Sequence, residues 1–171
     1  MDNFTNELID TRTLPKFEEV QFTQLHPDYW KVIMINLAIL FVILFGAAAL
    51  TLIFNEEARF YMLETLLGLF VFWFVVCIIS RISFAKKGYA FRTHDVLFRS
   101  GIIATNTTII PYNRVQHVSL HEGLIVRKFG LAEIQIFTAG ANGSDLEIPG
   151  ILKEEAENIK QLLMGKIQKA L

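Results

Sequence analysis

Two histidines four residues apart, His117 and His121, stand next to Glu122 in the second half of the chain. These residue types bind transition metals when several of them meet at one point. The surrounding pattern predicts a strand, on which positions four apart are separated by roughly 13 Å. Zinc needs nitrogen ligands at about 2 Å, so the pair cannot share one metal without ligands from elsewhere. We therefore expect no metal site, and a hydrogen-bonding role in which a histidine acts with Gln116 and Arg114 to tie neighbouring loops together.

Catalytic motifs are absent from the sequence. There is no Gly-x-Ser-x-Gly, no His-Glu-x-x-His and no glycine-rich phosphate loop. The single cysteine, Cys77, lies in an apolar run, where burial disfavours the reactive thiolate. The hydroxyl groups of Thr105–Thr108 have no identifiable base beside them. We predict that the chain is not an enzyme and needs no cofactor.

Basic residues form two groups that could bind a lipid headgroup or a partner. The residues are Arg81, Lys86, Lys87, Arg127 and Lys128. Each would add about 1 kcal/mol of attraction at an anionic leaflet. Any protein with a positively charged cytoplasmic side carries such residues, so lipid binding is an alternative here rather than the main prediction. From position 81 onward, 12 Lys and Arg stand among 8 Asp and Glu, which is net +4. Interspersed acids do not make the continuous basic stripe of a nucleic-acid binder, so we expect no nucleic-acid partner.

Two long apolar runs precede most of these residues and must position them. Val32–Phe54 has 23 residues and no charge, and Phe60–Ser80 has one acid. As a helix the first run would extend roughly 34 Å, enough for a hydrocarbon core of about 30 Å. Two buried helices of a soluble protein would need a large surrounding core, which 171 residues do not supply. We predict an N-terminal segment (1–31), a transmembrane hairpin (32–80, with spans 32–54 and 60–80) and a domain from 81 to 171.

The spans contain two strongly polar side chains, Asn36 and Glu64. An ionisable residue at membrane depth is a candidate for function, which leaves a transport role open. Both residues lie near the ends of their spans, so contact with the interface or hydrogen bonds within the hairpin are favoured. The small residues Gly46–Ala49 and Gly68 should fall at similar depths, where they would let the helices approach closely.

The orientation of the hairpin follows from Lys and Arg near the span ends. Asn55–Arg59 has one basic residue and two acids, whereas Lys31 precedes the first span and several basic residues follow the second. We predict that both termini are cytoplasmic. Ala47–Ala49 matches a signal-peptidase site, and cleavage there would invert the topology. The acid-rich residues upstream and the length of the run argue against cleavage.

The remainder of the chain alternates apolar and polar residues between regular turns, which is typical of short antiparallel strands. The expected strands are Ile82–Phe91, Val96–Ser100, Asn106–Pro111, Val115–Glu122, Ala132–Thr138 and Leu146–Ile148. Pro149-Gly150 should break the last strand. An amphipathic helix follows, with acids in its first turn and lysines in its last. Upstream, Met1–Leu25 either adds a short strand or stays mobile.

Several ordered pieces of this region resemble one known family. They are Tyr89, Arg92–Asp95, Leu97–Gly101, Thr108–Val118 (TIIPYNRVQHV), Glu122–Leu124, Arg127–Ala132 (RKFGLA), Ile134–Ile136 and Phe137–Gly140. This pattern is similar to the bacterial pleckstrin-homology-like domain of the YdbS-like family, whose small members carry two spans before one such domain. The resemblance implies a seven-stranded barrel with a C-terminal capping helix and no known catalytic residue. The motif residues with an expected structural role are Pro111, Arg114, Gln116, His117, Phe129, Gly130 and Gly140.

The fold class expected is therefore an α+β membrane protein, with a two-helix hairpin followed by a PH-like antiparallel barrel or sandwich and a capping helix. The expected function is a non-enzymatic interaction or scaffold module at the cytoplasmic face of the cell membrane. Its partners would be the lipid bilayer and a larger PH-like membrane protein, or further copies of itself. A sensor of anionic lipid headgroups and a small transport component are the alternatives.

Overall fold

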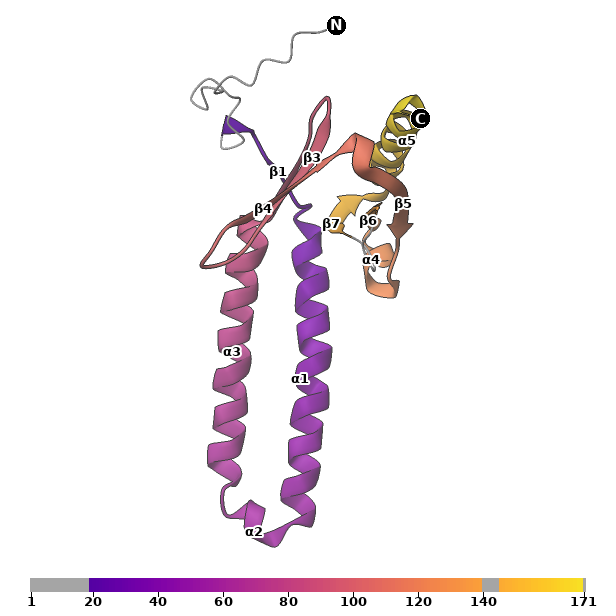
Figure 1. Cartoon of the computed structure of the whole chain (residues 1–171). Helices are drawn as coiled ribbons and strands as arrows, with labels where there is room; N and C mark the ends of the chain where they lie inside the picture. The colour runs from indigo at the N-terminus through magenta and orange to yellow at the C-terminus, as the bar shows by residue number, and fades with distance from the viewer. Residues whose placement is uncertain (1–18, 140–144, 171) are drawn as a thin grey trace, which may run out of the picture.

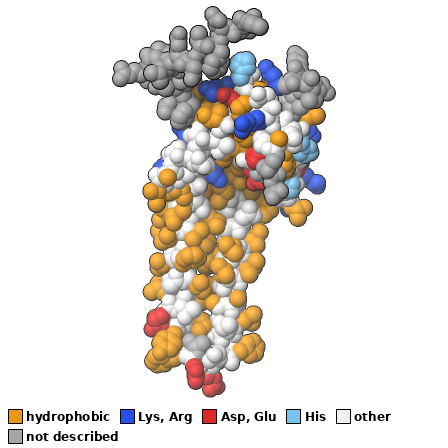
Figure 2. Space-filling model, in the orientation of Figure 1, with side chains coloured by type: hydrophobic (Ala, Val, Ile, Leu, Met, Phe, Trp, Pro, Cys, Tyr) orange, Lys and Arg blue, Asp and Glu red, His pale blue; other side chains and the backbone are white. Residues whose placement is uncertain are grey.

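Two long helices dominate the computed structural model, which describes residues 19–139 and 145–170 (Figure 1). They are α1 (Asp28–Phe54) and α3 (Met62–Lys86), and the short helix α2 (Glu56–Arg59) joins them. The two lie side by side, and their mean hydropathies of 2.8 and 2.5 make both apolar enough to cross a membrane. Figure 2 shows hydrophobic side chains covering this hairpin, while charged side chains gather on the head and at the loop end.

The head consists of two antiparallel sheets and a C-terminal helix. The first sheet has the order β1-β2-β3-β4 and the second has the order β5-β6-β7. The strands are β1 (Thr23–Gln24), β2 (Gly88–Phe91), β3 (Asp95–Ser100), β4 (Asn106–Pro111), β5 (Val115–His121), β6 (Leu131–Thr138) and β7 (Leu146–Leu152). The helices are η3 (Tyr112–Arg114), α4 (Leu124–Lys128) and α5 (Lys153–Ala170). This architecture confirms the α+β class and a PH-like sandwich. The sheets do not close into the barrel that the resemblance implied, because the described strands pair only within each sheet.

The first strand of the head comes from before the membrane hairpin. Thr23 pairs with Tyr89 and Gln24 with Gly88, so β1 lies antiparallel to β2. Leu25 follows and is buried in the core of the head. The alternative left open for the N-terminal segment is thereby decided in favour of a strand for Thr23–Gln24, whereas residues 1–18 lie outside the described part of the chain.

The core lies between the two sheets and under α5. Its fully buried side chains come from β3, β6 and β7, for example Val96, Ile134 and Ile148. Helix α5 contributes Ala156 and Leu163, which are also buried. Burial of large aliphatic side chains is the main favourable term in folding, so this head is stabilised by its own core.

Two predicted strand boundaries are wrong by several residues, and three others differ by one residue. The region from Ile82 to Lys86 continues α3 rather than starting a strand, because Phe84 packs on Trp30 (ring centroids 5.9 Å apart) and extends the contact between the helices. The last strand runs through Pro149-Gly150 to Leu152 instead of ending before it. Proline is tolerated there because β7 is an edge strand of its sheet, where a missing N–H breaks no ladder.

The head and the hairpin are packed against each other at one junction. The His26 N–H donates to the Gly150 carbonyl oxygen at 2.8 Å, which joins the start of α1 to β7. Gly150 has φ +67°, and a Cβ placed on it would lie 2.6 Å from Cγ of Tyr29. Glycine is therefore required twice over, for its backbone conformation and for its contact with α1.

Candidate functional site

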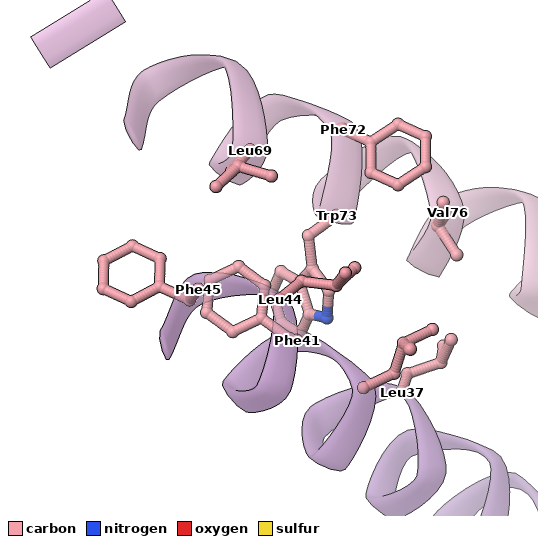
Figure 3. A pocket seen from close by; sticks show the side chains of 9 residues that line it. Leu37, Phe41, Leu44, Phe45, Leu69, Phe72, Trp73 and Val76 are labelled. Carbon is pink, nitrogen blue, oxygen red and sulfur yellow. The ribbon is translucent and has the colours of Figure 1, made fainter. Parts of the chain in front are cut away.

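An apolar groove lies between α1 and α3 (Figure 3). Its volume is about 100 Å³, and nine side chains from the two helices line it: Leu37, Leu40, Phe41, Leu44, Phe45, Leu69, Phe72, Trp73 and Val76. Among them, Leu40 and Phe72 are more than half exposed, so the groove opens to the outside of the hairpin. In a membrane this opening faces acyl chains or another transmembrane segment.

Trp73 is the only residue of the groove that carries a polar group on its side chain. Its ring packs on Phe41 with centroids 5.1 Å apart, and Figure 3 shows the indole reaching from α3 toward α1. The Nε1 atom is buried and has no hydrogen-bond partner in the described structure. Trp73 stands 11 residues after Met62 and 13 before Lys86, which is roughly 17 and 20 Å from the helix ends. The unpaired donor therefore lies near the middle of α3.

The predicted contact through small residues is wrong for the glycines. A Cβ added at Gly46 or Gly68 would meet nothing within 4 Å, so neither glycine touches the other helix. At this depth the helices instead leave a second apolar cavity of about 340 Å³, which Ala49 and Leu52 help to line. The aromatic pair Phe41–Trp73 makes a close contact between the two helices, with ring centroids 5.1 Å apart.

Asn36 and Glu64 do not form one site. Asn36 is eight residues into α1 from the head end, and Glu64 is two residues into α3 from the loop end. Both are exposed on the surface of the hairpin. No hydrogen bond joins the Asn36 side chain to another described residue. Because Asn36 and Glu64 lie toward opposite ends of the hairpin, they do not form one polar pathway for transport within a single chain.

The basic residues at the end of α3 make specific contacts. The Arg81 guanidinium lies over the rings of Trp30 and Phe84, at 5.1 and 5.6 Å. The ammonium group of Lys86 donates to the Ile102 carbonyl oxygen at 2.5 Å, across to the turn between β3 and β4. Lys87 is half-buried and ends the helix in an extended conformation. These three residues form a basic cluster at the junction of hairpin and head.

Arg127 and Lys128 form the second cluster, on the last turn of α4, and both are exposed. They lie on a short helix, and α4 contacts α1. Arg114 does not extend this cluster, because it precedes β5 whereas α4 follows it, and a seven-residue strand spans roughly 20 Å. Arg99 pairs with Gly88 between β2 and β3, so Arg99 lies near Lys87 rather than near the second cluster.

The histidines on β5 do not share a face with Val115. A bulge between Val115 and His117 shifts the register, so Val115 and Val118 are buried while His117 and His121 are exposed. The His117 ring packs on Phe137 with centroids 4.9 Å apart. Among the residues that the structure describes, no group of three or more His, Cys, Asp and Glu could hold a metal ion.

The remaining motif residues lie at turns. Pro111 ends β4 and begins η3, Phe129 ends α4, and Gln116 is exposed beside the bulge in β5. Gly130 has φ +66°, and its carbonyl oxygen accepts from the Lys153 N–H at 3.0 Å, which starts α5. Gly140 lies outside the described residues.

Buried tyrosines and one ion pair fix the turns of the head. Arg92 donates to both carboxylate oxygens of Asp95, which raises the pKa of the guanidinium. The Tyr112 hydroxyl donates to the Arg92 carbonyl oxygen at 2.6 Å, and burial raises the pKa of Tyr112 to about 12. The Tyr89 hydroxyl donates to Glu155 on α5 at 3.0 Å, and burial together with this bond raises the pKa of Tyr89. These bonds join the turns of the head to one another and to α5.

Two features escaped the sequence analysis. Trp73 stood in a uniformly apolar run, where nothing marks which face meets the other helix. Leu25 belongs to the core of the head although 62 positions separate it from Lys87. The sequence did offer one usable signal for Trp73. Its indole N–H needs a hydrogen-bond partner when the side chain lies away from the membrane interface.

Together, the hairpin and the sandwich define an α+β membrane protein whose small antiparallel head stands on two transmembrane helices. The chain belongs to the bacterial PH domain family, whose model matches residues 12–167. It is 33% identical over 85 residues to the UPF0699 transmembrane protein YdbS of Bacillus subtilis (strain 168), which covers 50% of this chain and 52% of that protein. It is 31% identical over 114 residues to the UPF0699 transmembrane protein YdbT of the same organism, covering 66% of this chain and 22% of that protein.

The chain thus spans about half of the length of YdbS and about a fifth of that of YdbT. No solved structure matches. The relatives' names and the two apolar helices identify a membrane protein of a family whose function is uncharacterised.

Proposed function

We propose that this protein is a membrane-anchored, non-enzymatic interaction module that assembles with a larger membrane protein of the same family. The hairpin holds the head at the cytoplasmic face, and the groove between α1 and α3 receives a transmembrane segment of the partner. The unpaired indole N–H of Trp73 in the middle of the hairpin is the observation that carries this proposal.

A protein partner explains this donor better than lipid does. Lipid carbonyl groups and water lie at the membrane interface, about 15 Å from the bilayer centre, and do not reach the depth of Trp73. Unpaired polar groups in hydrocarbon carry a free-energy cost, so they tend to find acceptors on neighbouring helices. A transmembrane segment packed into the groove would bring a hydroxyl, amide or free carbonyl oxygen to this depth. Since Nε1 is buried within the single hairpin, the Trp73 side chain would turn toward the open side of the groove to pair with that oxygen.

The position of Asn36 favours the same surface of the hairpin as the contact site for a partner. Asn36 lies one turn toward the head from Leu40, in the same row of α1, and Leu40 borders the open side of the groove. An exposed asparagine in a transmembrane helix favours association, because its amide otherwise faces acyl chains unpaired. A partner helix packed over Leu40 would contact Asn36 and cover the groove that Trp73 lines.

The family relationship favours a larger partner over a second copy. A 114-residue segment of this chain is similar to only 22% of the transmembrane protein YdbT. A unit of this type therefore also occurs within a much longer chain. Two related hairpins in one bilayer can pack with pseudo-symmetric contacts, as related subunits commonly do.

The cytoplasmic orientation rests on charge. Lys31, Arg81, Lys86 and Lys87 lie at the head end of the hairpin, whereas Arg59 is the one basic residue of the connection at the other end. To test it, single cysteines replace Glu56 or Thr93 in a Cys77→Ser background, and intact cells are treated with a membrane-impermeant maleimide. Labelling at 56 but not at 93 is expected, and the reverse pattern would invert the topology.

The assembly is tested by co-expressing this chain with the larger family member of its host, each with its own tag, followed by purification in mild detergent. Trp73→Phe keeps the ring but removes the donor, and one such bond between helices is worth about 0.6–1.7 kcal/mol. The complex should weaken roughly three- to sixteenfold. Trp30→Phe is the matched control, because that indole lies at the interface, and it should leave the complex unchanged.

Three results would revise the proposal. If Trp73→Phe leaves the assembly unchanged, the groove is not the surface that binds the partner. Assembly only with further copies of this chain would replace the larger partner by a homo-oligomer. A chain that stays alone in native mass measurements would overturn the interaction function.

Recognition of anionic lipid is the second candidate, because both basic clusters lie beside the head ends of the helices. Arg81 and Lys86 lie in the last turns of α3 and Lys87 follows it, whereas Arg127 and Lys128 lie on α4, which contacts α1. Reversing the charge of Arg127 and Lys128 should reduce the phosphatidylglycerol that the purified protein retains in native mass spectra. Equal retention would exclude a role for that cluster.

A further inference from the structure

Two segments of the head reach toward the membrane beside the hairpin, namely α4 and the turn between β3 and β4. We propose that both are bilayer anchors, and that Leu124 of α4 and Ile103 of the turn insert into the lipid interface. The head would then lie on the membrane at two points besides the helices. This inference is independent of the partner suggested for the groove.

The exposure of these two side chains sets them apart from the rest of the head. Ile103 is 101% exposed and Leu124 is 87% exposed. The other exposed large apolar residues of the described head are all less than half exposed: Ile109, Leu152, Leu162 and Met164. Full exposure of an isoleucine and a leucine to water is unfavourable, and it occurs here only on these two segments.

The contacts of both segments place them at the level of the membrane surface. Helix α4 contacts α1, and the turn accepts a hydrogen bond from Lys86, the last residue of α3. Figure 1 shows α4 beside the head end of α1 and the turn beside the head end of α3, on opposite sides of the hairpin. Since the two helices define the bilayer plane, the same plane passes close to both segments.

Basic side chains accompany each apolar tip. Arg127 and Lys128 follow Leu124 within α4, and Lys86 lies against the turn that carries Ile103. An apolar tip beside basic residues is the arrangement by which peripheral segments bind an anionic membrane surface. Trp30, near the start of α1, adds an aromatic residue of the type found at this interface.

The bilayer is favoured over a protein as the occupant because it is already present. The helices hold the tips beside lipid in every molecule, so insertion needs no further association step. Three points of attachment would also fix the tilt of the head and leave α5 and the turn between β2 and β3 facing away from the membrane.

The test uses the full chain in a Cys77→Ser background, reconstituted in vesicles of phosphatidylcholine and phosphatidylglycerol. A fluorophore sensitive to its environment is attached to a cysteine at position 103, 124 or 93. Thr93 is the control, since it is exposed at the opposite end of β3, roughly 20 Å from the anchor turn. Quenching by aqueous iodide is compared with quenching by lipid that carries a spin label on its acyl chain.

Labels at 103 and 124 should show a blue-shifted emission, several-fold weaker quenching by iodide, and strong quenching by the labelled lipid. The label at 93 should show the opposite behaviour. Equal iodide quenching at all three positions would overturn the proposal. Protection from iodide without quenching by the lipid would also overturn it, because the tips would then be covered by protein.

Discussion

The hairpin and the head are both rich in aliphatic and aromatic residues, but the head buries far more of them. Helix α3 has no buried residue and α1 has two, Val32 and Leu52. In the head, by contrast, Ile134, Ile136 and Ile148 are fully buried. The head therefore carries its own solvent-excluded core, whereas the hairpin depends on its surroundings. In the hairpin the informative residues are the polar ones, and in the head they are the exposed apolar ones.

The largest loss of stability should come from cutting the chain between hairpin and head so that the head loses β1 and Leu25. A fragment that begins at Lys87 lacks β1 and Leu25, and we expect it not to fold stably. A fragment in which His26 is joined to Lys87 by a short flexible linker keeps both, because Gln24 pairs with Gly88. Circular dichroism and urea denaturation of the two fragments check this. Equal stability would mean that the head does not need residues from before the hairpin.

The same comparison in the full chain uses Leu25→Ala, which removes a buried side chain from the core of the head. Such a truncation costs about 2–5 kcal/mol of unfolding free energy. Thr23→Ala is the matched control, since that side chain is exposed and its backbone pairing is kept.

A second pair of truncations tests the contrast between the regions directly. Ile134 in the head is fully buried, and Leu67 in the hairpin is 61% exposed. Ile134→Ala should destabilise the head by about 2–5 kcal/mol, because it leaves a cavity among packed neighbours. Leu67→Ala removes mainly contacts with lipid and should leave the unfolding of the head unchanged. Denaturation in detergent, followed by near-ultraviolet circular dichroism, measures both. A comparable loss for Leu67→Ala would show that hairpin and head unfold together.

Several parts of the head followed from its sequence pattern. The strand Asn106–Pro111 has the predicted bounds, and the C-terminal helix follows the three- and four-residue spacing of its apolar residues. The strand Thr23–Gln24 has only two residues, which is too short for any periodicity to indicate it. The region after Ser80 was misassigned because Ile82 and Phe84 alternate as they would on a strand, and only the contact with Trp30 decides for a helix.

The candidate site was harder to predict, for a physical reason. In a soluble helix the apolar face identifies the packed side, but in a membrane helix all faces are apolar. The groove around Trp73 therefore left no signal in the hydrophobic pattern. The two groups of basic residues were identified in advance, but their contacts, such as that of Lys86 with the Ile102 carbonyl oxygen, depend on the fold of the head.

A glycine pair probes the junction of the two regions. Gly150 and Gly130 both have φ near +66°, so alanine is strained at either position by about 1–2 kcal/mol. At Gly150 the added Cβ would also lie 2.6 Å from Tyr29, whereas at Gly130 it meets nothing within 4 Å. Gly150→Ala should therefore destabilise the protein more than Gly130→Ala. Adding Tyr29→Ala should reduce this difference without removing it, because the Cβ that remains at position 29 would still lie 2.8 Å from the added Cβ. Equal effects in denaturation experiments would mean that the head does not press on α1 there.

The smallest effect concerns alkaline pH and acts on the head alone. The pKa of Tyr112 is about 12 in the folded protein, above the usual value near 10 of an unfolded chain. Below pH 10 both states are neutral and stability is unchanged; above it the unfolded state loses its proton first, so stability falls until pH 12. At pH 11 the loss from this residue is about 1.4 kcal/mol. Tyr112→Phe should be less stable at neutral pH, because it loses the bond to Arg92, yet it should lose less between pH 9 and 11. A decline as steep as in the unmodified protein would assign the alkaline loss to other groups, of which Tyr89 is the first to test since its pKa is also raised.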